Sequence, residues 1–186
     1  MNDALVIAAI GALAGVVSGI VSALLKWVFD ERVQEKRLRL ELANARQLKL
    51  IDAQSALLDE LGNACWQWRY AAMRVVYYSD LQQDDAYKGA VANYHAQSWG
   101  YLSQIRTLGT RAGRLVSTSA PKAIEDFYEY IDEVGVDVEA AIAETDVKKR
   151  IMLFENISKT VEDDVRSKIQ TLIQRLAGRV GLVPPA

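Results

Sequence analysis

Two side chains in this sequence could support nucleophilic chemistry, and each is the only member of its type. Cys65 is the single cysteine and His95 is the single histidine, so a thiolate and imidazole pair is the one arrangement of this kind available. Cys65 lies in an apolar, aromatic stretch at residues 65–78, which predicts a buried and inert thiol. We therefore predict that His95 packs or forms a hydrogen bond and that neither group is catalytic.

A second possible chemistry is the binding of a magnesium ion by carboxylates. Glu125, Glu129, Asp132 and Glu133 are spaced so that they lie near one another on one predicted helix. A metal also needs ligands from a second helix, for which the acids at residues 162–164 are the nearest candidates. A solvated acidic face explains the same spacing, so we predict no metal and no other cofactor. The chain also lacks the P-loop and Gly-x-Gly-x-x-Gly motifs of nucleotide sites.

Charge is segregated along the middle of the chain. Residues 86–124 contain no Asp or Glu, whereas residues 125–146 contain nine acids and no Lys or Arg. The candidate contact residues are the bases Arg106, Arg111, Arg114 and Lys122, with the acids Glu125, Glu129, Asp132 and Glu133 as their candidate complement. Such segregation could pair segments within one bundle or between neighbouring copies. Two solvated faces would give the same pattern, and an anionic partner such as RNA or lipid headgroups is a less favoured third interpretation.

The first part of the chain carries a long uncharged segment. Ala4 to Leu25 comprises 22 residues without a charged side chain, which span roughly 33 Å as a helix at about 1.5 Å per residue. Lys26 and Trp27 follow directly and suit the headgroup region of a bilayer as interfacial anchors. We predict a transmembrane anchor over residues 1–29. A cleavable signal peptide is the alternative, but the leader has no basic segment and the apolar run is long.

The flanks of this segment predict its orientation. Seven Lys and Arg residues follow the uncharged run within about 25 residues, whereas none precedes it. The positive-inside rule then places the N-terminus outside and the rest of the chain in the cytoplasm. We expect a single-pass protein of a cell inner membrane.

Small residues recur within the predicted anchor. Gly11, Gly15, Gly19 and Ala23 follow one another every four residues, which leaves one helix face almost without side chains. Such a face allows two membrane helices to approach closely. Gly and Ala are also common in membrane helices without this role, but the regular spacing favours a homo-oligomer.

The remaining sequence predicts helices, since no window alternates as a strand does. We expect a helical stalk at residues 30–61, joining a cytoplasmic antiparallel bundle at residues 62–177 and a tail at residues 178–186. Within the bundle we predict helices over about 65–78, 84–108, 121–145 and 146–178, with a linker at 109–120 and a possible bend at 62–63. Gln47 and Gln54 interrupt a heptad pattern, which favours bundle packing over an extended coiled coil. The predicted fold class is therefore all-α, with a transmembrane helix and a bundle of four to five helices.

These features predict a scaffold or adaptor without catalytic activity. The 186-residue chain carries 22 Lys and Arg against 24 Asp and Glu, a net charge of −2 that argues against constitutive nucleic-acid binding. The expected partners are the lipid bilayer, further copies of the chain and an unidentified cytoplasmic protein. An oligomeric pore-forming effector is the main alternative, and an enzyme using Cys65 and His95 or the acidic helix is the weakest. The layout resembles that of small membrane accessory proteins of bacterial antiviral systems, including those of type VI-B RNA-guided RNases, which implies a defence role.

Overall fold

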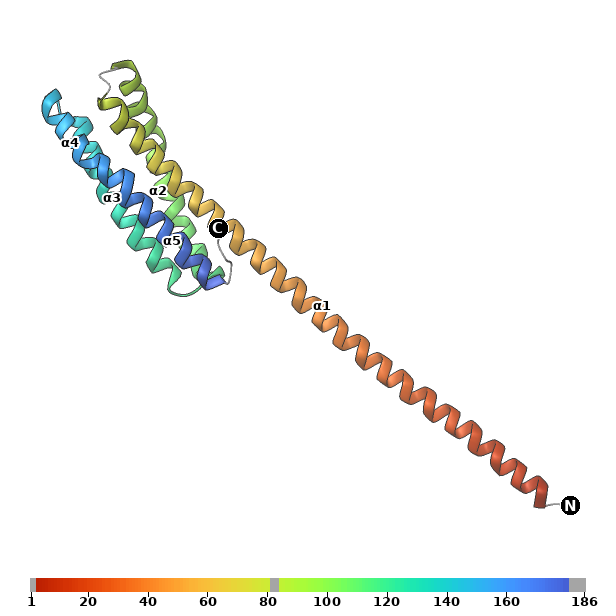
Figure 1. The fold of residues 1–186 in the computed structure, drawn as a ribbon. Coiled ribbons are helices and arrows are strands. Elements are labelled where there is room, and N and C mark those ends of the chain that lie inside the picture. Colours follow the sequence, from red (N-terminus) through yellow and green to blue (C-terminus); the bar gives the residue numbers. More distant parts are fainter. Residues whose placement is uncertain (1–2, 81–83, 181–186) are drawn as a thin grey trace. The chain divides into compact units, whose positions relative to one another are not determined.

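The computed structural model describes the backbone of residues 3–80 and 84–180, and the side chains of residues 26–27, 29–79 and 85–180. This part of the chain is helical and contains no strand (Figure 1). The elements are α1 (Asp3–Asp80), α2 (Asp84–Leu115), α3 (Ala120–Ala143), α4 (Val147–Lys159), η1 (Thr160–Asp164) and α5 (Val165–Val180). The chain divides into two compact units, Met1–Lys49 and Leu50–Ala186, and α1 contributes residues to both.

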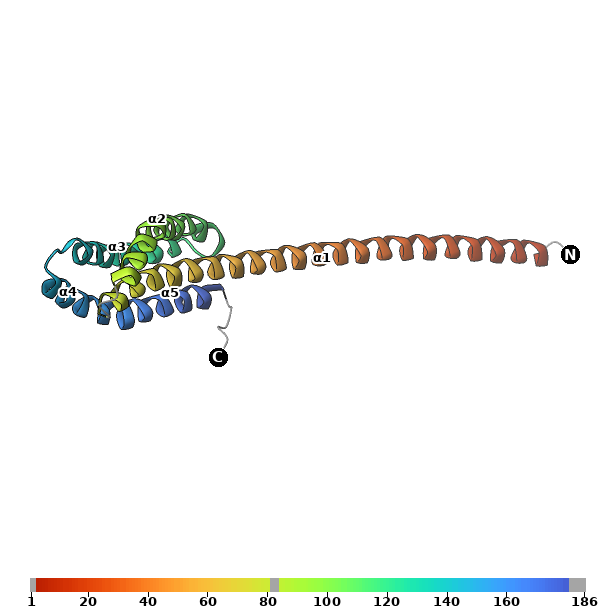
Figure 2. The ribbon, with the colours of Figure 1, turned by 90° about the horizontal axis from the view of Figure 1, so that it is seen from above.

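The second unit is an antiparallel bundle of four long helices, because α4, η1 and α5 follow one another without a break. Figures 1 and 2 show α2, α3 and the α4–α5 helix alongside the last part of α1. Gln54 of α1 donates a hydrogen bond of 2.5 Å to the carbonyl of Leu115, at the end of α2. Since Gln54 lies near the start of this part of α1, the two helices run in opposite directions. The prediction of an all-α antiparallel bundle is confirmed.

Contacts between the other neighbours follow the same antiparallel order. On α2 and α3, His95 contacts Glu139, and the later residue Arg106 lies over the earlier residue Tyr128. Lys168 of α5 lies over the ring of Tyr130 of α3 at 4.2 Å. Each helix therefore packs against the helix that precedes it along the chain, as expected for short connections.

The core is filled by side chains from all four helices. Trp68 of α1 is 0% exposed and lies beside Gly135 of α3, where an added Cβ would be 3.7 Å from the indole ring. The hydroxyl of Tyr94, from α2, would lie 3.5 Å from the same Cβ. Gly135 thus lies beside two large aromatic residues in the middle of the bundle. The largest fully buried side chains are Trp68, Tyr94, Phe154, Leu57, Leu61, Ile105, Ile124, Ile131, Ile169, Leu176, Val75 and Val138.

Two helix starts agree with their sequence signals. α3 begins after Ser119, with Pro121 in its first turn, where the fixed φ of proline suits a helix. The N-cap of α4 is Asp146, whose carboxylate accepts hydrogen bonds from the backbone amides of Lys148 and Lys149 at 2.9 and 3.4 Å. Both predicted starts are confirmed.

The helix from Val147 to Val180 contains one turn of π-helix at η1. There the amide of Val165 bonds to the carbonyl of Thr160, five residues earlier. Arg69 of α1 donates through Nε to the carbonyl of Val161 and through Nη2 to that of Glu162, both at 2.9 Å. One guanidinium group therefore joins α1 to the wide turn of the opposite helix.

The boundaries differ from the predicted ones at three places. α1 passes through Gly62 without a break, and α5 continues to Val180, beyond Gly178. The predicted linker at 109–120 is wrong, because α2 extends to Leu115 and leaves residues 116–119 as the connection. Gly109 and Gly113 remain helical because both face α3, where their lack of a side chain permits close packing. Residues 81–83, which lie between the predicted helices at 65–78 and 84–108, and residues 181–186 of the predicted tail lie outside the described residues.

Every described side chain from Lys26 to Lys49 is exposed. In the portion of the chain whose side chains are described, no helix is both long and apolar enough to cross a membrane. The predicted packing residues Gly11, Gly15, Gly19 and Ala23 lie outside that portion, as does most of the predicted anchor.

Candidate functional site: the groove between α2 and α3

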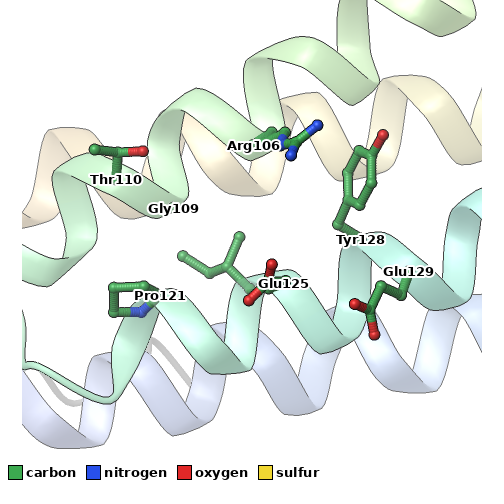
Figure 3. Close-up of a pocket in the computed structure, with 8 residues that line it drawn as sticks. Arg106, Gly109, Thr110, Pro121, Glu125, Tyr128 and Glu129 are labelled. Atoms are coloured by element: carbon green, nitrogen blue, oxygen red, sulfur yellow. The ribbon is translucent and has the colours of Figure 1, made fainter.

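A groove with a volume of about 440 Å³ lies between α2 and α3 of the bundle (Figure 3). It contains three of the charged residues singled out in the sequence, Arg106 from α2 and Glu125 and Glu129 from α3. Its full lining is Arg106, Gly109, Thr110, Pro121, Ile124, Glu125, Tyr128 and Glu129. The groove is thus formed by one helical segment on each side, joined by the connection at residues 116–119.

Glycines shape one wall of this groove. A Cβ added to Gly109 would lie 3.3 Å from Cγ2 of Ile124, and one added to Gly113 would lie only 2.9 Å from Cγ of Pro121. The second distance is shorter than carbon atoms tolerate, so α2 and α3 approach here more closely than other residues would allow. Ile124 and Pro121 therefore form an apolar floor close to the backbone of α2.

The charged groups stand at the edge of the floor. The guanidinium carbon of Arg106 lies 5.8 Å from the centre of the Tyr128 ring, a cation–π geometry. In Figure 3 this guanidinium points toward Tyr128, and the carboxylates of Glu125 and Glu129 lie along α3. The arrangement offers an apolar floor, one cation and two carboxylates. It can accept a side chain that has an apolar body and a cationic end.

The other predicted charged residues contact different partners. Arg111 forms an ion pair of 2.6 Å with Glu60 of α1, and Lys122 forms one of 2.8 Å with Asp126, one turn along α3. The hydrogen bond from Lys122 to Asp126 raises the pKa of the lysine. Arg114 and Glu133 are exposed, and Asp132 is half-buried. Within the described bundle, no ion pair joins the predicted basic group to the predicted acidic group.

Sequence reasoning missed the partners that tie the helices together. Glu60 lies 51 residues from Arg111, and Arg69 binds carbonyls more than 90 residues away. No local pattern links these positions, because the contacts depend on how whole helices pack. Arg179 likewise donates to the hydroxyls of Ser117 and Ser119, which holds the α2–α3 connection to α5.

Cys65 and His95 occupy different environments. Cys65 is buried, and desolvation raises the pKa of its thiol to about 12, so it is protonated at neutral pH. His95 is exposed and its Nε2 lies 2.9 Å from Oε2 of Glu139. The prediction of a buried Cys65 is confirmed. The hydrogen bond predicted for His95 is formed with Glu139.

The aromatic residues at 66–78 divide between two sides of α1. Trp68 is in the core, whereas Trp66 is 37% exposed, as the angle of about 200° between positions two apart requires. Tyr70 and Tyr77 are also exposed on α1. Only some of the aromatic side chains at residues 66–78 are therefore part of the core.

Among the described residues, no group of three or more His, Cys, Asp or Glu side chains is placed to hold a metal ion. By its fold the second unit is an up-and-down four-helix bundle. Comparison with known proteins finds no family model, curated protein or solved structure that matches the chain.

Proposed function

We propose that this chain is a membrane-anchored, self-associating helical scaffold that presents its bundle to a protein partner in the cytoplasm. The observation that carries the proposal is the uncharged run from Ala4 to Leu25, followed at once by Lys26 and Trp27. The excess of Lys and Arg after the run supports an inner-membrane location with the N-terminus outside. The Gly11, Gly15 and Gly19 stripe supports association of copies through the anchor.

Two features of the bundle support a docking role in place of catalysis. The single thiol of the chain is held protonated in the core, where it cannot act as a nucleophile at neutral pH. The α2–α3 groove combines an apolar floor with Arg106, Tyr128 and two carboxylates. Arg and Tyr are enriched at protein interfaces, so the groove is the surface at which we place the partner.

The first experiment tests the anchor. Membranes containing the full-length protein are washed with alkaline carbonate, and the same wash is applied to Val16→Arg/Val17→Arg. Each arginine at the centre of a spanning helix costs about 3 kcal/mol, so we expect the wild type to remain in the membrane and the variant to be released. Gln34→Arg/Asn44→Arg adds the same charge outside the run and should remain bound. Release of the wild type would contradict the proposal.

A second experiment tests the groove. A photo-reactive residue replaces Thr110, which lines the groove, or Ser103, which is exposed elsewhere on α2. We expect irradiation of living cells to give one discrete adduct from position 110 and none from position 103. Equal adducts from both positions, or none, would contradict docking in the groove.

A conducting pore is the second candidate function, favoured by the spacing of Gly11, Gly15, Gly19 and Ala23. A pore needs close packing of the anchors, so Gly15→Leu should abolish leakage of a dye from vesicles that contain the protein. If the wild-type protein causes no leakage, the pore is contradicted and the scaffold remains the proposed function.

A further inference from the structure

Helix α3 is strongly acidic, and much of its charge has no partner within the described bundle. Its 24 residues include seven Asp and Glu side chains and a single Lys. Two of these acids are engaged, because Asp126 pairs with Lys122 at 2.8 Å and Glu139 contacts His95 at 2.9 Å. The acids of α3 that join no ion pair among the described residues are Glu125, Glu129, Asp132, Glu133 and Asp137. This negative charge complements a partner of opposite charge.

Trp99 of α2 is exposed on the side of that helix that faces α3. Its side chain is 68% exposed. It lies four residues after His95 and seven before Arg106, so these three side chains share one side of α2. His95 contacts Glu139 and Arg106 lies over Tyr128, both of which belong to α3. Trp99 therefore lies at the outer edge of the contact between the two helices.

Val136 of α3 lies at the same level as Trp99. Because α2 and α3 are antiparallel, the same two contacts place position 99 opposite positions 135 and 136. Val136 is 64% exposed, so this level of the surface carries two exposed apolar side chains. The floor of the groove, Pro121 and Ile124, is a second apolar site. Val136 lies 12 residues after Ile124, a rise of about 18 Å along α3.

Three of the acids without an ion pair lie between the two apolar sites. Glu125, Glu129 and Asp132 follow one another at spacings of four and three residues, so they form one row along α3. Figure 3 shows the first two carboxylates beside the groove. We call the surface formed by this row and the two apolar sites the acidic face. Along about three turns of helix it is apolar, then acidic, then apolar.

This pattern restricts the chemistry of a partner. Nucleic acids and anionic lipid headgroups are repelled by the acidic row. A helix that carries Lys or Arg between apolar residues matches the face, because residues eleven apart rise about 16.5 Å and point to nearly the same side. Helix α5 of a second copy is basic and contains no acid, but none of its described large apolar side chains is exposed. It therefore lacks the apolar residues that the face requires.

We propose that the acidic face binds a basic amphipathic helix of the partner protein. Two apolar residues about eleven positions apart on that helix occupy the two apolar sites. Lys or Arg residues between them pair with the acidic row. The inference rests on the proposed scaffold function and deepens it by naming the chemistry of the partner.

Photo-crosslinking of the full-length protein in mild detergent with a defined peptide tests the proposal. The probe is an alanine-rich synthetic helix of about 20 residues, with leucines at positions i and i+11, lysines at i+4 and i+7, and one photo-reactive residue. We expect the adducts, located by mass spectrometry, to lie on residues 99–110 and 121–136. A probe with glutamates in place of the lysines should label these residues about tenfold less or weaker, because the acidic row repels it.

Matched variants of the protein separate the acidic face from the net charge. Glu125→Gln/Glu129→Gln removes two charges of the row and should reduce labelling by the lysine probe about fivefold. Glu162→Gln/Asp163→Asn removes two charges from exposed residues of η1 and should leave labelling within about twofold. Trp99→Ala should also reduce labelling, because it removes an apolar site. Circular dichroism should show the same helix content for all variants.

The opposing outcomes follow from the same measurements. Absence of labelling, equal labelling by both probes, or equal reduction by both double variants would overturn the proposal. A photo-reactive residue at position 136 that links two copies of the full-length protein would assign the face to a second copy and would also overturn it. If position 110 gives its adduct in cells but the lysine probe does not label the face, docking in the groove stands and only this inference fails. If the probe labels the face as expected but carbonate releases the wild type, only the proposed anchoring fails.

Discussion

Helix α1 contains apolar side chains in two different environments. Between residues 57 and 76 the apolar side chains that face the other helices of the bundle, including Leu61 and Trp68, are buried. Between residues 26 and 49 side chains of the same type, such as Phe29 and Leu40, are exposed. The comparison indicates that residues 57–76 of α1 are stabilised by packing within the bundle, whereas the described side chains of residues 26–49 gain no such burial. Changes in the two parts should therefore be detected by different measurements.

The largest expected difference concerns the core. Trp68→Ala removes a fully buried indole beside Gly135 and Tyr94, and should lower the free energy of unfolding of the bundle by about 3 to 5 kcal/mol. Leu40→Ala, in the exposed segment, should leave that quantity unchanged. Urea unfolding of the full-length protein in mild detergent, followed by near-UV circular dichroism, measures both. Equal losses would show that the two parts of α1 unfold as one unit.

Alkaline pH provides a test of the bundle core. The pKa of Cys65 rises from an ordinary value of 9.0 to about 12 because burial disfavours the thiolate. Below pH 9 the thiol is neutral in both states, and above it the unfolded chain loses the proton first. Stability should therefore fall as pH rises, by about 2 to 3 kcal/mol at pH 11.

Cys65→Ala provides the matched control for this pH effect. Its urea midpoint should fall less between pH 8 and pH 11 than that of the wild type, whatever its stability at pH 8. Tyr94 acts in the same direction in both proteins, because burial and the nearby Glu139 and Asp132 raise its pKa. Identical pH profiles would show that the thiol ionises without unfolding the bundle.

Two glycines of α2 sharpen the comparison within one helix. Gly113→Ala would place a Cβ 2.9 Å from Pro121 and should destabilise the bundle by about 1 to 3 kcal/mol. Gly100→Ala meets no atom within 4 Å and should stabilise α2 by about 0.5 to 1 kcal/mol. Thermal unfolding of the two variants should shift in opposite directions. A shift in the same direction would mean that α2 and α3 are not packed closely at the groove.

The smallest expected effect concerns two ion pairs with the same 2.6 Å distance, one in each part of the chain. Arg111 and Glu60 join α2 to α1, and a double-mutant cycle with alanine should give a coupling of about 0.2 to 1 kcal/mol in bundle stability. Arg39 and Glu35 belong to a single helix outside the bundle, and their cycle should give no coupling there. Coupling for both pairs would again join the two parts into one folding unit.

Much of the bundle could be predicted from the sequence because helices follow local rules. The three- and four-residue spacing of Phe154, Ile157 and Val161 predicted a helix, and Asp146 and Pro121 predicted where helices begin. The end of α2 could not be predicted in this way. Gly109 is a helix-ending signal in isolation, but its packing against Ile124 outweighs its low helix propensity.

The sequence by itself determined the helical class, the segregated charges and the uncharged run at residues 4–25, since these depend on neighbouring residues. Only the tertiary structure decided that Arg106, Glu125 and Glu129 share a groove while Arg111 pairs with Glu60. It also decided the π-helical turn, whose carbonyls bind Arg69 from another helix. The physical reason is that such contacts join positions far apart in the chain, and helix packing alone sets which of them meet.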